Sequence, residues 1–146
     1  MDEHRETEAS ATNATTAGKW IVVSLPTHEI SVVDGGAVVR TITHFSTGRQ
    51  GHLTPLISNG AIDPDRRYRT HRSSIYKDGA GQGASMPFAL FFQGGCAFHA
   101  GDPDVESHGC IHLQPEDAEW LFGWVGRDTV HVRILGPRPA TSVQRV

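Results

Sequence analysis

One cysteine stands among three histidines between residues 98 and 113, and this combination can perform nucleophilic chemistry. Cys110 directly follows His108 and Gly109, and ten residues separate it from His99. A thiol attacks an acyl carbon as its thiolate, and a neighbouring imidazole can accept its proton. Glycine before the cysteine lets the backbone turn its N–H groups toward a developing oxyanion. The pattern favours a cysteine acyltransferase.

A turn-rich segment, residues 101–104, joins the strand that ends at His99 to the cysteine motif. Such a loop can fold back and place the imidazole beside the thiol. A backbone carbonyl near Ala100 can orient the ring, and the N–H groups of His108, Gly109 and Cys110 are candidate oxyanion donors. From the residues alone, a structural cysteine with hydrogen-bonded histidines stays an open alternative.

A zinc site is the competing interpretation, because His99, His108, Cys110 and His112 offer nitrogen and sulfur ligands. An extended segment would place residues 108, 110 and 112 on one face, too close along the chain for easy tetrahedral closure. The motif also lacks a C-x-x-C or H-x-x-x-H pair. We therefore expect no metal.

The second cysteine, Cys96, is expected to be an inert, buried residue. Alternation along its strand places Cys96 and Phe98 on one face and His99 on the other. A disulfide between Cys96 and Cys110 would consume the nucleophile, and two cysteines make no disulfide framework.

Composition predicts one strand-rich domain. The chain has 146 residues, of which 16 are Gly and 8 are Pro, so turns are frequent. A net charge of −3 argues against nucleic-acid binding. No apolar run approaches the roughly 18 residues of a membrane span.

Hydrophobic periodicity predicts strands at residues 20–24, 28–33, 38–43, 86–92, 96–100 and 129–135. Asp34, Gly35 and Gly36 form a hairpin signal. Residues 57–83 are polar and glycine-rich, with scattered short strands at best. A helix is expected from Pro115 to Val125, with Gly126 as its C-terminal cap. Its apolar face is Ala118, Leu121, Phe122 and Val125.

The expected organisation is a disordered leader at 1–18, a catalytic domain at 19–136 and a tail at 137–146. The leader has no hydrophobic run, so no signal peptide is expected. The arginines between Arg66 and Arg72 are expected to be solvated surface, although arginine also suits carboxylate ligands. Trp120 and Trp124 are expected to pack on the helix.

His99, a loop and Ser107-His108-Gly109-Cys110-Ile111 match a known signature, and other elements match in the same order: a hairpin at 30–39, Ser46-Thr47-Gly48, Thr54-Pro55, Met86-Pro87-Phe88 and Glu116-Asp117-Ala118. On these residues the chain resembles the L,D-transpeptidase catalytic domain of the YkuD type. The resemblance implies a mostly-β fold, a β-sandwich or mixed-sheet domain with one helix after the cysteine motif.

The resemblance also implies roles. Cys110 would be the nucleophile and His99 the base, while His108 would shape the site and Gly109 would contribute a backbone donor. Ser107, His112 and Phe88 would contact substrate. The thiolate would attack the L-centre carbonyl of residue three of a peptidoglycan tetrapeptide stem, release D-alanine and pass the acyl group to an amine. No metal or organic cofactor is implied.

The chain departs from the family pattern at His112, where Arg or Asn is usual, and Leu56 replaces a common glycine after Thr54-Pro55. At His112, carboxylate binding would depend on imidazole protonation. The short gap between His99 and Cys110 implies an open cleft, so L,D-carboxypeptidase activity is an alternative.

A non-catalytic peptidoglycan- or metal-binding module is the alternative from another class. The resemblance implies a periplasmic or extracytoplasmic location, yet the chain shows no signal peptide. A signal that was removed, or delivery as an anti-bacterial effector, would each reconcile the two. An effector would be expected to have an immunity or delivery partner.

Overall fold

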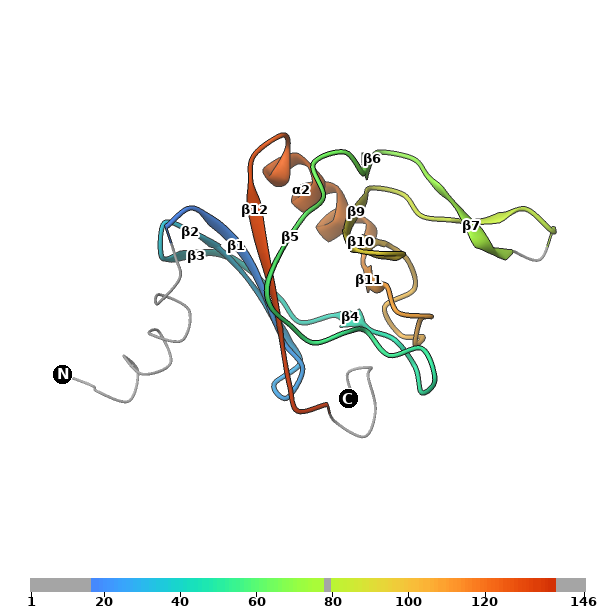
Figure 1. Cartoon of the computed structure of the whole chain (residues 1–146), viewed down its shortest axis with the longest axis horizontal. Helices are drawn as coiled ribbons and strands as arrows, with labels where there is room; N and C mark the ends of the chain where they lie inside the picture. Colours follow the sequence, from blue (N-terminus) through green and yellow to red (C-terminus); the bar gives the residue numbers. More distant parts are fainter. Residues whose placement is uncertain (1–16, 78–79, 139–146) are drawn as a thin grey trace.

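The computed structural model describes residues 17–77 and 80–138, which form two five-stranded sheets, a two-stranded hairpin and one helix, α2 (Figure 1). The strands are β1 (Lys19–Ser24), β2 (Glu29–Asp34), β3 (Ala37–Ile42), β4 (Phe45–Ser46), β5 (Ile57–Ala61), β6 (Arg67–Tyr68), β7 (Arg72–Lys77), β8 (Gly83–Ser85), β9 (Ala89–Gln93), β10 (Cys96–Ala100), β11 (Ile111–Leu113) and β12 (Val130–Leu135). The mostly-β class with one helix after the cysteine motif is confirmed.

The first sheet has the order β3-β2-β1-β12-β5, with β1 parallel to β12 and the other neighbours antiparallel. Alternate residues of β12 are buried, as the sequence predicts: Val130, Val132 and Ile134. At the β2–β3 turn, Gly35 and Gly36 both have positive φ, a conformation that glycine adopts without steric cost. The predicted hairpin is therefore confirmed.

The second sheet has the order β4-β11-β10-β9-β6 and carries the catalytic candidates. Its central pair, β10 and β11, is parallel, and the register sets His99 opposite His112. The apolar run predicted as a strand from residue 86 pairs as β9 only from Ala89. The reason is local, because Pro87 has no N–H to donate and Phe88 has a φ of 56°.

One hydrophobic core lies between the two sheets and α2. Both sheets and the helix contribute to it, for example through Ile21, Phe98 and Leu121, all of them fully buried. The other face of the second sheet carries a smaller apolar cluster. Cys110 packs against this second cluster, so the candidate active site lies on this face of the sheet.

Helix α2 (Pro115–Val125) begins and ends where the sequence predicts. Pro115 occupies its first turn, and the N–H of Gly126 donates to the carbonyl of Phe122 at 3.0 Å. Trp120 and Trp124 stack on each other, as their expected packing role requires. Lys19 lies over the ring of Trp124, which ties the helix to β1.

The middle of the chain is more ordered than its composition suggests. Residues 57–83 contribute β5 to the first sheet, β6 to the second, and the β7–β8 hairpin, which projects away from both sheets in Figure 1. Strands β5, β6 and β8 pair through backbone hydrogen bonds and contain no fully buried residue, so they lack a hydrophobic period.

Most of the expected leader (1–18) and tail (137–146) lies outside the described residues. Within the described ranges, no helix combines the length and apolar character needed to span a bilayer.

Candidate active site

The candidate catalytic residues lie on the face of the second sheet that points away from the main core. Ala97 on this face packs with Met86, Ala89 and Phe91, and Cys110 packs against the same cluster. Alternation places His99 on the same side as Ala97, and the register sets His112 beside it. Parallel pairing of β10 and β11 thus brings the predicted base and nucleophile to one surface.

His99 is oriented by the backbone, as the sequence predicts. The ring is 5% exposed, and its Nδ1–H donates to the carbonyl of Ala100 at 2.7 Å. That bond leaves Nε2 as the proton acceptor. Burial, with a smaller contribution from the charge of His112, lowers the pKa of His99 to about 4, so the ring is neutral at neutral pH.

Cys110 rests as a neutral thiol. Its Sγ–H donates to the carbonyl of Gly95 at 3.4 Å, and burial raises the thiol pKa to about 11. Among the described residues, no hydrogen bond joins Cys110 to His99. The resting arrangement is a neutral thiol near a neutral imidazole, without a preformed ion pair.

Ser107 holds the nucleophile loop in place. Its side chain is 3% exposed, accepts from the N–H of Gly109 at 3.0 Å and donates to the carbonyl of Cys110. The donor hydrogen of this hydroxyl and one of its two acceptor positions are thus used within the loop, and the contact of Ser107 with substrate stays a prediction. The N–H of Gly109 is likewise engaged and is no oxyanion donor in this conformation, whereas the N–H of Cys110 has no backbone partner among the described residues.

Thr54 joins the nucleophile loop to the loop that follows β4. Its hydroxyl donates to the carbonyl of Gly109 at 2.7 Å and accepts from the N–H of Gly48 at 2.9 Å, and the side chain is 2% exposed. A Cβ on Gly48 would lie 2.0 Å from the carbonyl oxygen of His52, so this close approach requires glycine. The two loops form one hydrogen-bonded unit beneath Cys110.

His108 is exposed and lies between two neighbours. Arg49 Nη2 donates to its Nε2 at 2.8 Å, and the ring of Tyr76 from β7 stacks on it with centroids 4.2 Å apart. The edge of His52 meets the same ring. His108 therefore links the β7–β8 hairpin to the nucleophile loop, in keeping with the shaping role predicted for it.

His112 is partly exposed beside His99 and does not offer a fixed positive charge. Its Nδ1–H donates to the carbonyl of Asp102 at 3.1 Å, and its ring meets the edge of His99 with centroids 5.0 Å apart. Burial lowers the pKa of His112, partly offset by hydrogen bonds to the carbonyls of Asp102 and Val105. A Cβ on Gly101 would lie 2.8 Å from this ring. His112 is therefore a neighbour of His99, and its Nδ1–H is already engaged with the backbone carbonyl of Asp102.

Phe88 and Cys96 are both partly exposed, and for Cys96 this corrects the expected burial. Phe88 is half-buried and packs against Phe122 of α2, with centroids 5.7 Å apart, on the main-core side of the sheet. Its positive φ turns the chain there, and its contact with substrate stays a prediction. Cys96 is only partly buried, because it begins β10 at a register shift, and a Cβ on Gly109 would lie 3.4 Å from its Sγ.

The family-model comparison bears directly on this site. The model of the L,D-transpeptidase catalytic domain, YkuD, matches residues 18–134. The chain belongs to this family. The match includes the whole arrangement described above, from β1 to β12, and confirms the resemblance seen in the sequence.

Solved structures of L,D-transpeptidases share the fold. The enzyme from Stackebrandtia nassauensis is 26% identical with a TM-score of 0.71, over 85% of this chain and 58% of its own. L,D-transpeptidase 1 from Mycobacterium tuberculosis is 26% identical with a TM-score of 0.64, over 82% and 62%. That of Xylanimonas cellulosilytica has a TM-score of 0.65 at 22% identity, over 89% and 69%.

The chain thus spans less than two thirds of the first two transpeptidases. A search of curated proteins found no match. Among the described residues, no group of three or more His, Cys, Asp or Glu is arranged to hold a metal ion.

Sequence reasoning did not assign roles to four residues of this transpeptidase site. Thr54 was noted only as part of the Thr54-Pro55 element that resembles the family, without a role. Gly95 accepts a hydrogen bond through its backbone carbonyl, and because every residue has one, the residue type gives no signal. Arg49 and Tyr76 meet His108 from other loops. No local pattern in the sequence indicates these contacts, because each of them joins segments that lie apart along the chain.

Proposed function

We propose that this chain is a peptidoglycan L,D-transpeptidase in which Cys110 is the nucleophile and His99 the base. The observation that carries the proposal is the hydrogen bond from His99 Nδ1 to the carbonyl of Ala100, on the same sheet face as Cys110. It sets the tautomer that a general base needs, with Nε2 as the acceptor. Residues 19–136 form the proposed catalytic unit.

Catalysis begins when the Cys110 S–H turns from Gly95 to His99 and gives its proton to Nε2. The thiolate attacks the L-centre carbonyl of residue three of a tetrapeptide stem, and the Cys110 N–H faces the oxyanion. When the tetrahedral intermediate collapses, its C–N bond breaks and the leaving D-alanine amine takes the proton from His99. A thioester remains on Cys110.

The second half-reaction uses the same residues in reverse. His99 removes a proton from an amine on another stem, the amine nitrogen attacks the thioester, and the C–S bond breaks. The departing sulfur takes the proton back from His99. Because the resting pair is neutral, acylation requires the Cys110 thiol to leave its hydrogen bond to Gly95 before it gives its proton to His99.

Hydrolysis is the second candidate, favoured by the short connection between β10 and β11. This loop is held against β4, since Ser46 Oγ donates to the carbonyl of Val105 at 2.7 Å. His44 Nε2 also meets the Asp104 carboxylate at 2.8 Å. A loop held there leaves Cys110 less covered, and water as acceptor would make the enzyme an L,D-carboxypeptidase.

The experiment is incubation of the purified chain with isolated muropeptides, followed by mass spectrometry. Cross-linked dimers with loss of D-alanine support transpeptidation, and tripeptides alone support hydrolysis. The Cys110→Ala variant should form neither product, while a matched Cys96→Ala variant should retain both activities. Product formation by Cys110→Ala would overturn the assignment of the nucleophile.

The same assay tests the remaining alternative, a module that binds peptidoglycan without chemistry. Such a module would retain tetrapeptide affinity in both cysteine variants and release no D-alanine. Peptidoglycan, the proposed substrate of this chain, lies outside the cytoplasmic membrane. We therefore propose that the protein acts there.

A further inference from the structure

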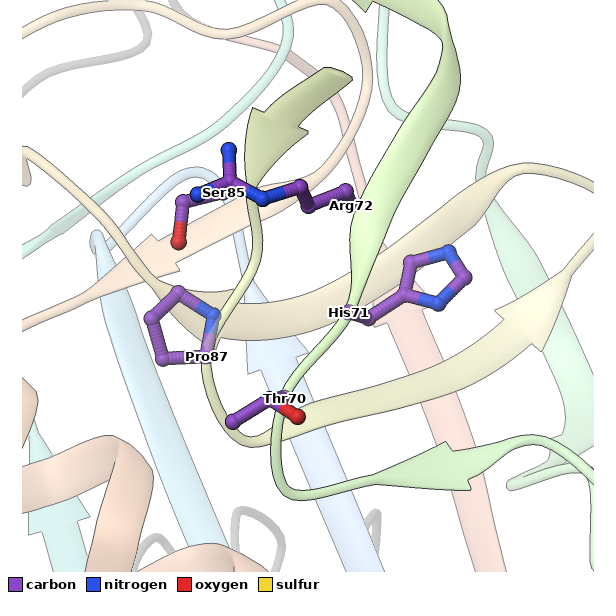
Figure 2. Close-up of a pocket in the computed structure, with 5 residues that line it drawn as sticks. All are labelled: Thr70, His71, Arg72, Ser85 and Pro87. Atoms are coloured by element: carbon purple, nitrogen blue, oxygen red, sulfur yellow. The ribbon is translucent and has the colours of Figure 1, made fainter. Parts of the chain in front are cut away.

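Contacts from other parts of the chain hold the nucleophile loop, and one of them comes from the β7–β8 hairpin, where Tyr76 stacks on His108. Figure 2 shows a polar pocket of about 370 Å³ at the base of this hairpin, lined by Thr70, His71, Arg72, Ser85 and Pro87. Its side chains do not converge on one point, because the His71 ring points away from the others. A separate contact reaches the nucleophile loop through Thr54, from the segment that follows β12.

This C-terminal segment is residues 136–138. Strand β12 pairs antiparallel with β5, and Ile134 lies opposite Ile57. Because antiparallel strands run in opposite directions, the residues after Ile134 lie beside those before Ile57. The C-terminal segment therefore meets the end of the loop that joins β4 to β5. The family model matches residues 18–134, so this segment lies beyond the part that the family shares.

Leu56 and Gly136 form the first contact between the loop and the C-terminal segment. A Cβ on Gly136 would lie 3.1 Å from Cδ1 of Leu56, so the leucine side chain lies directly against this glycine. Leu56 is also the residue that stands where the family commonly has glycine. A glycine at position 56 would have no side chain to pack there, so the contact depends on a residue particular to this chain.

Arg138 makes the second contact. Its Nη2 donates to the backbone carbonyl of Thr54 at 2.6 Å, and a hydrogen bond from a charged donor is stronger than one between neutral groups. Within the described part of the chain, residues 53–56 make no hydrogen bond to another backbone group, and Pro55 has no N–H to donate. The guanidinium of Arg138 therefore anchors a stretch of backbone that has no ladder of its own.

Thr54 passes this anchoring to the nucleophile loop. Its hydroxyl donates to the carbonyl of Gly109 at 2.7 Å and accepts from the N–H of Gly48 at 2.9 Å. The carbonyl of Gly109 and the N–H of Cys110 belong to one planar peptide, so they turn together. A shift in the backbone of Thr54 moves its hydroxyl and, with it, the direction of the Cys110 N–H.

We propose that Arg138 is a positioning residue for acyl transfer, acting through Thr54 on the Gly109–Cys110 peptide. It contacts neither the substrate nor the reacting atoms. Without it, the Thr54 backbone samples more orientations, and the Cys110 N–H faces the oxyanion for a smaller fraction of the time. The proposal rests on the proposed function, because this N–H affects the rate only of a reaction that forms an oxyanion.

The kinetic test measures turnover of a synthetic tetrapeptide. Arg138→Gln should lower kcat about 3- to 10-fold and leave KM within about twofold, because the lost hydrogen bond orients a catalytic donor and binds no substrate. Arg138→Lys retains a charged donor and should restore part of the rate. Arg133→Gln is the matched control, since Arg133 Nε donates to the carbonyl of Ser58 in β5 at 3.0 Å, outside the loop. It should change neither constant.

A double variant tests whether Arg138 acts through Thr54. In a Thr54→Val background the hydroxyl is already gone, so Arg138→Gln should lower kcat no further. Losses that multiply in the double variant would show that Arg138 acts by another route and would contradict the proposal. An unchanged kcat in Arg138→Gln, or a rise in KM at constant kcat, would contradict it as well.

Amide hydrogen exchange separates failure of this proposal from failure of the proposed function. The N–H of Gly48 donates to the Thr54 hydroxyl, so its exchange rate, measured by NMR, reports on the anchoring without any substrate. Arg138→Gln should speed this exchange about threefold or more, and Arg133→Gln should leave it unchanged. A wild-type chain that turns over no peptide would refute the proposed function. Unchanged Gly48 exchange in Arg138→Gln would refute the role of Arg138, whether or not the wild-type chain is active.

Discussion

The hydroxyl of Thr54 donates to the carbonyl of Gly109, the residue directly before the nucleophile. The same oxygen accepts from Gly48, so one buried atom fixes two loops against each other. The Gly109–Cys110 peptide carries both that carbonyl and the N–H proposed to face the oxyanion. Thr54 thus sets the direction of an oxyanion donor that it does not touch.

Replacing Thr54 by Val should lower kcat about 10- to 100-fold with little change in KM, because a lost hydrogen bond leaves two buried polar groups unpaired. Thr54→Ser retains the hydroxyl and should restore most of the rate. A merely structural role would instead lower thermal stability in both variants and leave the kcat of the folded fraction unchanged. Steady-state kinetics on a tetrapeptide, with calorimetric melting, separates these results.

The resting thiol should show no plateau of reactivity near neutral pH. Because burial raises the pKa of Cys110 to about 11, its alkylation by iodoacetamide should accelerate about tenfold per pH unit between pH 7 and 10. The measurement uses a Cys96→Ala background, so that Cys110 is the one thiol that iodoacetamide can alkylate. A rate that levels off below pH 8 would show a preformed thiolate–imidazolium pair and contradict the neutral resting state.

Stability should fall as pH drops from about 6.5 to 4. The unfolded chain binds a proton on His99 in this range, whereas the folded chain, with a pKa of about 4, does not. The difference favours the folded state above pH 6.5 by about 3 kcal/mol and is lost as pH falls toward 4. Burial lowers the pKa of His28 and His112 in the same direction. Urea unfolding between pH 4 and 7 should therefore show a smaller slope in His99→Gln.

Gly101 makes room for His112. Gly101→Ala should cost about 1–3 kcal/mol, because the new methyl group would lie 2.8 Å from the imidazole. The cost should largely disappear in a His112→Ala background. Gly123→Ala is the matched control: no atom lies within 4 Å of its Cβ position, and alanine favours the helix. Chemical denaturation of the four variants tests this, and equal costs in both backgrounds would exclude the contact.

The β7–β8 hairpin should loosen when Tyr76 loses its ring. The stack on His108 is worth about 0.5–1.5 kcal/mol, so Tyr76→Ala should speed backbone hydrogen exchange in β7 by up to about tenfold. Tyr76→Phe retains the stack and should exchange like wild type. Identical exchange in all three proteins would show that the stack does not hold the hairpin.

Elements with a strong hydrophobic period were predictable from the sequence. Strand β12 alternates buried and exposed positions, and α2 buries Ala118, Leu121 and Val125 along one face. The β2–β3 turn and the ends of α2 carry glycine or proline at the required places. By contrast, β5 pairs without a buried position, and the pairing of β1 with β12 joins residues about 110 positions apart. Local pattern contains no information about such pairing.

The site was predictable to the extent that it lies within one motif. His99, Cys110 and the carbonyl of Ala100 follow from a short stretch of chain. The hydrogen bonds of Ser107 and Thr54 are different, because each depends on how a loop closes on itself or on another loop. Phe88 shows the same limit, since a single positive φ turns its ring toward α2.

The position of β12 between β1 and β5 has a consequence for synthesis on the ribosome. The nucleophile and base emerge before the strand that completes the first sheet, so the main core cannot close until Leu135 has left the exit tunnel. Until then the chain exposes the apolar faces of β1 and β2 and depends on protection from aggregation. The proposed active site therefore gains its complete supporting core only after synthesis of its own residues is over.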